Sequence, residues 1–428
     1  MTEQFSSAST PEKLVVIGQG YVGLPISMRA IEVGYQVVGL DVDTSRAQRL
    51  VAGTSYVEDV SDEALRQALA SGRFTASATY DAAVGFDYVV ITVPTPLTEG
   101  LPDLGFIEQS AADIAPHIRP GSTVVLESTT YPGTTDELLV PILESGSGLK
   151  AGVDFYVGYS PERIDPGNAH FNFVNTPKVV SGIDAQSSAR IEAFYATVVD
   201  RVVVVSDCKV AELTKLLENT FRHVNIALVN ELAMFAHDLG INVWEAIDAS
   251  STKPFGFMKF TPGPGVGGHC LPIDPSYLSW RVKRALGQSF RFVELANDVN
   301  DHMPDYVIRR LVVALNEQKR SMNGSRILVL GLAYKKNTGD ARESPSTRVV
   351  ELMLGMGCEV RVADPHVTTP YFDSRVIQVD VSPDELDAAD AVVLLVDHNA
   401  FDYDAIAATT TFILDTRHRM SGATVEYL

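Results

Sequence analysis

The chain has 428 residues, of which 46% are hydrophobic, and its 54 acidic and 34 basic residues give a formal net charge of −20. This charge disfavours nonspecific binding to nucleic acid or to an anionic membrane, because both would repel the protein. No apolar run reaches the roughly 18 residues of a membrane span, and residues 1–10 lack the features of a signal peptide. We therefore expect a cytoplasmic protein with no nucleic-acid or membrane partner.

The first part of the chain alternates short β-branched runs with longer amphipathic stretches. The runs begin at residues 13, 36, 74, 87, 122 and 155 and read KLVVIG, QVVGLDVD, FTASAT, DYVVITVP, STVVLEST and FYVGYS. This alternation is typical of βαβ units on a parallel sheet. The run RVVVVS at 201–206 closes the predicted first domain, residues 1–206.

The turn after the first of these runs carries Gly18, Gly20 and Gly23 in the G-x-G-x-x-G spacing. Glycines at such a turn let a pyrophosphate approach the backbone N–H groups at a helix N-terminus. Asp41 ends the next strand, where a carboxylate bonds the ribose of NAD and repels the 2′-phosphate of NADP, although Arg46 weakens that repulsion. The pattern favours an NAD site over a purely structural glycine turn.

Residues 207–305 have the character of long helices. The longest pattern covers 209–240 and ends at Gly240, a residue type that commonly caps helices. It is apolar almost all round, so we expect a buried helix, at the centre of the molecule or in a dimer interface. Its large apolar residues are Leu213, Leu216, Leu217, Phe221, Val224, Leu228, Leu232 and Phe235.

A second alternation follows the polar link at 319–325, with the runs RILVLG, CEVRVADP, AVVLLVD and TFILDTR. The predicted fold class is therefore α/β, with two doubly wound Rossmann-like domains joined by a central helical domain that contains a long helix. In the second alternation a single glycine, Gly331, replaces the dinucleotide fingerprint. Lys335, Lys336 and Arg342 follow that strand, and they indicate either a second phosphate-bearing ligand or a basic surface cluster.

Three cysteines, Cys208, Cys270 and Cys358, are too few and too scattered for a disulfide framework or a metal knuckle, so no metal site is predicted. Cys270 lies in the segment PGPGVGGHCLPIDP, where glycines leave room for a substrate to approach the thiol. The alternative is that Cys270 is a small buried hydrophobic residue. The surrounding glycines and Asp274 count against this alternative. His269 either tunes the thiol or packs on its neighbours.

Two further groups of polar residues remain ambiguous by spacing alone. Lys215, Asn219 and Arg222 form one stripe on the long helix, and they face either an internal network or a ligand. The loop YSPERIDPGN supplies Glu162, Arg163 and Asp165, which would also suit a solvated turn.

Taken together, these motifs resemble the UDP-glucose/GDP-mannose dehydrogenase family from residue 13 to about residue 420. The resemblance is carried in chain order by GQGYVGLP, TPLTEGLPDL, ESTTYPGTT, SPERIDPGN, ELTKLLENTFR, GGHCLPIDP and KKNTGDARESP. It implies an NAD domain (1–206), a central dimerisation and catalytic domain (207–305) and a UDP-sugar domain (306–428). It also implies a homodimer built on the long helix.

The resemblance implies a role for particular residues. The NAD site would be lined by Gly18, Gly20, Tyr21, Val22, Gly23, Asp41, Arg46, Thr95, Thr129, Asp165 and Arg342. Catalysis would use Cys270, Lys215, Asn219, Glu162, Asp274 and Thr129. The substrate would contact Glu162, Arg163, Lys215, Asn219, Arg222, Phe260, Gly267, Tyr334, Lys335 and Arg417.

The reaction implied is oxidation of a sugar C6 alcohol to a carboxylate in two hydride transfers, with Cys270 as covalent nucleophile and Glu162 as general base for hydrolysis. GGHC and SPERIDPGN resemble the branch that acts on 2-acetamido sugars, so UDP-N-acetylglucosamine is the first candidate substrate. UDP-glucose and the N-acetylmannosamine and N-acetylgalactosamine derivatives are alternatives. A noncatalytic nucleotide-binding protein would not need these residues, and a two-electron dehydrogenase would have no use for Cys270.

Overall fold

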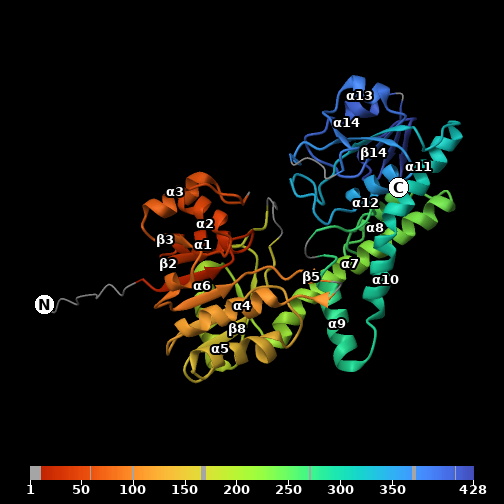
Figure 1. The fold of residues 1–428 in the computed structure, drawn as a ribbon. Coiled ribbons are helices and arrows are strands. Elements are labelled where there is room, and N and C mark those ends of the chain that lie inside the picture. Colours follow the sequence, from red (N-terminus) through yellow and green to blue (C-terminus); the bar gives the residue numbers. More distant parts are fainter. Residues whose placement is uncertain are drawn as a thin grey trace. The chain divides into compact units, whose positions relative to one another are not determined.

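A computed structural model describes residues 11–57, 59–98, 101–164, 170–268, 271–368, 373–409 and 411–428. The chain divides into two compact units between Glu218 and Asn219. Figure 1 shows the elements of both, coloured along the sequence. Each unit is built on its own sheet, which agrees with the predicted α/β class with two Rossmann-like parts.

The N-terminal unit, up to Glu218, contains an eight-stranded sheet in the order β10-β9-β8-β7-β4-β1-β2-β3. Its strands are β1 (Lys13–Ile17), β2 (Gln36–Leu40), β3 (Phe74–Ser77), β4 (Tyr88–Ile91), β7 (Thr123–Leu126), β8 (Tyr156–Tyr159), β9 (Lys178–Gly182) and β10 (Val202–Val204), with a separate hairpin of β5 (Leu97–Thr98) and β6 (Leu101–Pro102). Its helices are α1 (Gly23–Glu32), α2 (Thr44–Val51), α3 (Asp62–Ala70), α4 (Gly105–Ile114), α5 (Val140–Ser147) and α6 (Ala185–Val198), with short helical turns at Tyr80–Ala83, Ala115–His117 and Thr135–Leu139.

Strand direction in this sheet follows the prediction from β3 to β8, where every neighbouring pair is parallel. The sequence did not predict β9, which runs antiparallel to β8. The described residues between these two strands form no crossover helix, and a parallel connection requires such a crossover. β10 then pairs parallel with β9 and completes the edge of the sheet.

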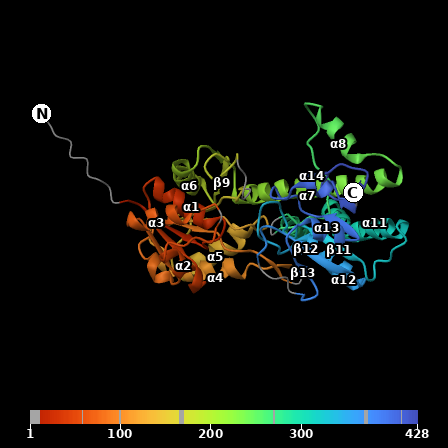
Figure 2. The same ribbon diagram turned by 90° about the horizontal axis from the view of Figure 1, so that it is seen from above.

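Helices cover both faces of this sheet. Side chains of α1 and α6 pack with one face in a core that includes Leu24, Ile191 and Phe194, and Figure 2 shows α4 and α5 on the opposite side. The register places Leu40, Ile17, Ile91, Leu126 and Tyr159 in one row across the parallel strands. The loops that follow these residues therefore emerge at the same edge of the sheet, which is where doubly wound sheets bind ligands.

The long helix α7 (Cys208–Asp238) begins in the N-terminal unit and continues through the boundary into the C-terminal unit, which starts at Asn219. Four other helices precede the second sheet: α8 (Val243–Ser251), α9 (Asp274–Leu286), α10 (Arg291–Asp301) and α11 (Met303–Glu317). In Figure 1, α9 and α10 form a hairpin of two adjacent helices. None of the helices in the described ranges is long and apolar enough to cross a membrane.

The second sheet is entirely parallel, in the order β13-β12-β11-β14-β15-β16. Its strands are β11 (Arg326–Leu330), β12 (Glu359–Ala363), β13 (Ile377–Gln378), β14 (Ala391–Leu394), β15 (Phe412–Asp415) and β16 (Val425–Tyr427). Its helices are α12 (Pro345–Gly355), α13 (Pro383–Ala388) and α14 (Tyr403–Ala407). Side chains of α11 and α12 pack on one face, and those of α13 and α14 pack on the other.

Several of the apolar residues of α7 that were predicted to be buried are exposed in the structure. Leu216 is fully buried, but Leu217, Phe221, Leu228 and Phe235 are 62%, 46%, 52% and 56% exposed. The expectation that the helix is buried at the centre of the molecule is therefore wrong for this stripe, because the described residues leave these side chains largely exposed. The alternative in the prediction, a helix that packs in a dimer interface, stays a prediction.

Candidate active site

The glycine turn after β1 has the geometry that a dinucleotide requires. Gly18 has a φ of +89°, and a Cβ there would lie 2.7 Å from the Thr92 backbone oxygen. A Cβ at Gly23 would clash with the backbone oxygen of Gly18, so α1 starts directly against the turn. A Cβ at Gly20 would meet no atom within 4 Å. That open space at the N-terminus of α1 is the room that a pyrophosphate needs.

Asp41, directly after β2, closes the same turn. Its carboxylate accepts hydrogen bonds from the backbone N–H groups of Gln19 and Asp43, each at 3.0 Å. The Arg46 guanidinium lies 3.6 Å from Asp41 and stacks on the ring of Tyr56, whose hydroxyl donates to the Gln19 carbonyl at 2.8 Å. Because a carboxylate can accept about four hydrogen bonds, Asp41 keeps capacity for the ribose hydroxyls. The residues present thus fit NAD.

Four of the other predicted cofactor residues lie along one edge of the sheet. Tyr21 and Val22 stand in the glycine turn itself, and Tyr21 is 44% exposed. Thr95 follows β4 and Thr129 follows β7, and both are half-buried. Asp165 lies outside the described residues, and Arg342 belongs to the C-terminal unit.

At this edge, beyond β8, the predicted base Glu162 lies in a buried cluster of charges. Glu162 is 8% exposed, and its Oε1 accepts a hydrogen bond from the Ile164 backbone N–H. Its Oε2 lies 3.7 Å from the Nζ of Lys178, whose ammonium also forms an ion pair with Glu127. Lys215 of α7 donates to the Glu162 backbone carbonyl. Burial raises the pKa of Glu162, while the Lys215 charge and the backbone hydrogen bonds oppose that rise.

Glu212, one turn before Lys215 on α7, fixes the loop that follows β7. Its carboxylate, which is fully buried, accepts from the backbone N–H groups of Gly133 and Thr135 at 2.5 and 2.9 Å and from the Thr135 hydroxyl at 2.7 Å. Burial raises the pKa of Glu212 to about 7 despite these bonds. The loop that carries Thr129 is thus anchored to α7 by a carboxylate that titrates near neutral pH.

The two arginines predicted to contact substrate differ in their surroundings. Arg163 forms a two-point ion pair with Glu218, at 3.2 and 2.6 Å, and donates to the Pro177 carbonyl at 2.6 Å. Arg222, in contrast, is exposed, so it does not share the burial of Lys215 and Asn219, which are each 7% exposed. The predicted polar stripe on α7 therefore has two buried members.

In the C-terminal unit, Asn219 and Asp274 are in direct contact. The Asn219 Nδ2 donates to the Asp274 Oδ2 at 2.5 Å, and both side chains are buried. The structure thus brings together two of the predicted catalytic residues, one from α7 and one from the start of α9. The predicted nucleophile Cys270 and its neighbour His269 lie outside the described residues.

The glycine-rich segment before Cys270 is fixed by a buried amide network. Asn230 of α7 accepts from the Gly263 backbone N–H at 2.9 Å and donates to Asn300 of α10 at 2.9 Å. Asn297 bonds the His223 ring at 2.7 Å, and burial lowers the pKa of His223, which favours the neutral ring. These polar groups satisfy one another, so α7, α10 and the segment form one rigid support.

Gly267 and Gly268 let this segment approach the loop after β11. A Cβ at Gly267 would lie 2.7 Å from the Glu343 backbone oxygen, and one at Gly268 would lie 2.9 Å from the Tyr334 ring. Gly268, with a φ of +97°, donates its N–H to the Glu343 carbonyl at 3.1 Å. The structure therefore brings together Gly267 and Tyr334, two residues predicted to bind substrate.

The remaining predicted substrate residues are spread over the C-terminal unit. Phe260 packs edge-on against Phe221 with ring centroids 5.7 Å apart. Arg417 donates from Nε to the Leu395 carbonyl at 2.8 Å, and its guanidinium lies beside Gly263. Arg342, which was predicted to contact NAD, is exposed and forms a two-point ion pair with Asp340, at 2.9 and 2.7 Å.

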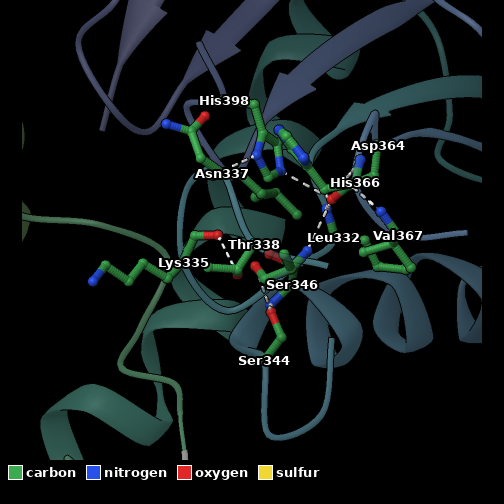
Figure 3. A network of polar contacts seen from close by, with 12 residues as sticks. Leu332, Lys335, Asn337, Thr338, Ser344, Ser346, Asp364, His366, Val367 and His398 are labelled. Carbon is green, nitrogen blue, oxygen red and sulfur yellow. Dashed lines mark hydrogen bonds and ion pairs between the residues drawn. The ribbon is translucent and has the colours of Figure 1, made fainter. Parts of the chain in front are cut away.

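A buried network shown in Figure 3 holds the loop after β11 in place. Asp364, at the end of β12, accepts from the backbone N–H groups of Leu332 and Ala333 at 2.7 and 3.0 Å and from His398 Nε2 at 3.0 Å. His398 Nδ1 in turn accepts from the Asn337 N–H at 2.9 Å. In Figure 3 the side chain of Lys335 points away from this pair.

Sequence reasoning missed Lys178, Glu127 and Glu212. Lys178 was missed because KVVSG was not recognised as a strand, although a lysine directly before β-branched residues is an unusual start for a buried strand. Glu212 had a usable signal, because it precedes Lys215 by three residues and so shares its helical face.

The fold and these features define an NAD-binding α/β dehydrogenase, and comparison with known proteins places it more closely. Three sequence profiles of the UDP-glucose/GDP-mannose dehydrogenase family match the chain: the NAD binding domain at residues 12–199, the central domain at 209–302 and the UDP binding domain at 328–421. The chain therefore belongs to the UDP-glucose/GDP-mannose dehydrogenase family and is an NAD-dependent nucleotide-sugar dehydrogenase.

Similar proteins extend over almost the whole chain. UDP-N-acetyl-D-mannosamine dehydrogenase of Pyrococcus horikoshii is 35% identical and covers 91% of this chain and 90% of its own length. UDP-N-acetyl-D-glucosamine 6-dehydrogenase of Salmonella typhi is 36% identical, with the same coverage of 91% and 90%. The solved structure of UDP-D-ManNAc dehydrogenase from Pyrococcus horikoshii is 33% identical, has a TM-score of 0.87 and covers 97% of this chain and 98% of that one.

Proposed function

We propose that this protein oxidises the C6 alcohol of a UDP-N-acetylhexosamine to the carboxylate, with transfer of four electrons. The observation that carries the proposal is that the NAD-compatible turn at Gly18–Gly23 and the buried Glu162 follow strands of one parallel sheet and lie at the same edge. Relatives over 90% of the chain that are named for UDP-N-acetyl sugars support the acetamido class.

The proposed chemistry assigns one task to each side chain. NAD bound at the glycine turn supplies the oxidant, accepting one hydride in each of two rounds. Between the rounds the Cys270 sulfur adds to the C6 aldehyde, and the second oxidation leaves a thioester on Cys270. Lys215 and Asn219 stabilise the negative charge that develops on the C6 oxygen. Asp274, which accepts from Asn219, orients that amide.

Hydrolysis of the thioester completes the proposed cycle. Glu162 takes a proton from water, the water oxygen bonds to the acyl carbon, and the C–S bond breaks to release the Cys270 thiolate. The sum is one alcohol, one water and two NAD⁺ converted to one carboxylate, two NADH and three protons. The UDP moiety is proposed to contact Tyr334, Lys335 and Arg417 in the third domain, residues 306–428.

Among acetamido sugars, UDP-N-acetylglucosamine is the first candidate, because GGHC and SPERIDPGN are the motifs that set this branch apart. UDP-N-acetylmannosamine is the second candidate, because a relative and a solved structure at 35% and 33% identity are named for that sugar. The two sugars differ only in configuration at C2, so contacts to the acetamido group decide between them.

The experiment that tests this function is NADH formation measured at 340 nm with purified protein, NAD and each UDP-sugar in turn. We expect two NADH per acetamido sugar and little turnover of UDP-glucose. Preference for UDP-N-acetylmannosamine would replace the first candidate by the second. One NADH per sugar would contradict the four-electron mechanism, and preference for UDP-glucose would contradict the acetamido class.

We further propose a cytoplasmic homodimer in which α7 packs against a second copy of the chain. The exposed apolar stripe on α7 supports this, since Leu228, Leu232 and Phe235 are 52%, 46% and 56% exposed. The double variant Leu228→Glu/Phe235→Glu is expected to be monomeric by light scattering, whereas the wild type has twice that mass. A wild-type monomer would contradict the dimer.

A further inference from the structure

The charges around Glu162 form a closed, buried set that the proposed mechanism does not yet explain. Lys178, the first residue of β9, is 3% exposed and lies between two carboxylates, Glu127 after β7 and Glu162 after β8. Tyr195 of α6 is fully buried and donates to the other oxygen of Glu127 at 3.2 Å. An ammonium without a compensating charge is costly to bury, so the burial of Lys178 calls for a structural or functional explanation.

Both carboxylate oxygens of Glu127 have partners, so Glu127 can hold the Lys178 ammonium in one position. One of its oxygens is paired with Lys178 and the other with Tyr195, and it is 1% exposed. The ammonium of Lys178 also lies over the rings of Phe173 and Tyr195, at 5.6 and 5.4 Å. Lys178 is thereby held in one position, from which its charge acts on Glu162 at 3.7 Å.

We propose that Lys178, held by Glu127 and Tyr195, is a positioning residue that keeps the Glu162 carboxylate ionised and correctly oriented as the general base. This inference rests on the function proposed above. On the carboxylate of Glu162, Oε1 accepts a hydrogen bond from the Ile164 N–H. The Lys178 ammonium forms an ion pair with the other oxygen, Oε2, at 3.7 Å.

In the described part of the chain, the other charged groups that act on Glu162 are Lys215 and Arg163. Lys215 of α7 donates to the backbone carbonyl of Glu162, and its charge also opposes the rise in the pKa of the Glu162 carboxyl. Arg163, next in the chain, is paired with Glu218. Burial raises the pKa of Glu162 and holds the pKa of Lys178 well below its usual range, with the Lys215 charge as a second cause for Lys178. Two flanking carboxylates favour the charged form of Lys178.

The role predicts which chemical step suffers. Both oxidation rounds precede hydrolysis, so loss of Lys178 should leave them intact and slow the attack of water on the thioester. In Lys178→Met, which has a similar length and no charge, we expect a burst of NADH followed by slow turnover. Intact-protein mass spectrometry should then detect the acyl adduct on Cys270. Lys178→Arg retains the charge and should restore turnover in part.

The pH profile of turnover separates electrostatic positioning from a merely structural role. Removing the cation in Lys178→Met should raise the pKa of Glu162. The acid limb of the profile, where turnover falls as pH falls, should then move to higher pH. A shift of one pH unit corresponds to about a tenfold loss of rate on that limb. Removing the anion in Glu127→Gln should let Lys178 act on Glu162 alone and move the limb to lower pH. A loss of stability alone would not shift the two pH profiles in opposite directions.

The matched control is Arg310→Met in the C-terminal unit, which removes another buried cation from an ion pair, with Glu426 at 3.2 Å. It should lower the melting temperature without moving the acid limb. If both cluster variants shift the limb in the same direction, or if neither shifts it, Lys178 does not position Glu162. If Lys178→Met does not fold, Glu127→Gln alone decides by the sign of its shift.

Failure of this inference is distinct from failure of the proposed function. Wild-type protein must first release two NADH per sugar, and Glu162→Gln must accumulate the acyl adduct. If either fails, the four-electron reaction or the role of Glu162 is wrong. If both hold and Lys178→Met still hydrolyses the thioester at the wild-type rate with an unshifted limb, only the role of Lys178 is overturned.

Discussion

The two Rossmann-like sheets place an aspartate at the same point, after the second strand in sequence, and use it in opposite ways. In the N-terminal unit Asp41 accepts from two backbone N–H groups. In the C-terminal unit Asp364 accepts from four backbone N–H groups and from His398. A carboxylate accepts about four hydrogen bonds, so Asp364 is saturated by the protein and Asp41 retains capacity for a ligand.

The loops after β1 and β11 both begin with a glycine, but they differ in length and in the residues that they carry. Gly18 and Gly331 both have a φ near +90°, at 89° and 87°. In the N-terminal unit α1 begins five residues later, whereas α12 begins only at Pro345. The longer second loop carries Lys335, Lys336 and Arg342, and the Asp364–His398 pair anchors it. One fold therefore provides a helix N-terminus for a dinucleotide in one unit and a basic loop in the other.

The largest effect is expected from neutralising the saturated aspartate. Asp364→Asn removes a charge that four backbone N–H groups and His398 share, and it turns an acceptor into a donor. We expect a loss of about 3 kcal/mol in the free energy of unfolding, measured by urea denaturation. The control Asp373→Asn alters an exposed pair with Arg375 and should change little. Equal stability of both variants would contradict the structural role of Asp364.

A comparison of two glycines tests whether the first loop, and not the second, accommodates the dinucleotide. Gly20→Ala adds a Cβ where no atom lies within 4 Å, so its melting temperature should stay near wild type while NAD affinity falls tenfold or more by calorimetry. Gly331→Ala places a Cβ 2.5 Å from that of Val396 at a positive φ, so stability should fall and NAD affinity should not. The reverse pattern would reject the assignment of the two loops.

The smallest effect concerns pH and contrasts Glu212 with Asp364. Burial alone would raise the pKa of Asp364, but its hydrogen bonds from His398 and the backbone outweigh burial and lower that pKa. Its contribution to stability is thus present above the ordinary aspartate pKa of about 4 and is lost only in stronger acid. The pKa of Glu212 is raised instead, to about 7.

Because the native state binds the Glu212 proton more tightly than the unfolded state, stability should fall as pH rises from about 4.5 to about 7. Glu212→Gln should remove this part of the pH dependence, as read from melting temperatures between pH 5 and 8. Glu137→Gln serves as the control, because Glu137 is an exposed glutamate in the short helical turn Thr135–Leu139. An identical slope in wild type and Glu212→Gln would show that Glu212 does not titrate in this range.

Much of the fold could be predicted from the sequence because its signals are local. The runs that became β1, β4, β7 and β11 are continuous β-branched segments, and buried parallel strands have this composition. β9 escaped notice because it has five residues and pairs antiparallel through contacts distant in sequence. Local patterns cannot report such a pairing.

The candidate site was predictable to a lesser degree, for a related reason. The glycine spacing and Asp41 form a local signature, so their placement followed from sequence. Lys178 and Glu127 are 51 positions apart in the chain and became partners only when β7, β8 and β9 lined up. Leu217 and Leu228 of α7 are exposed in the single chain. An apolar pattern predicts burial but does not identify the surface that would cover it.

The continuity of α7 limits how this chain can vary in length. Glu212, Lys215, Asn219 and Asn230 project from one uninterrupted helix, and each has a partner fixed by its angle around the axis. One inserted or deleted residue would rotate everything beyond it by about 100°. A change in residue count between positions 212 and 230 would therefore put these side chains out of phase at once.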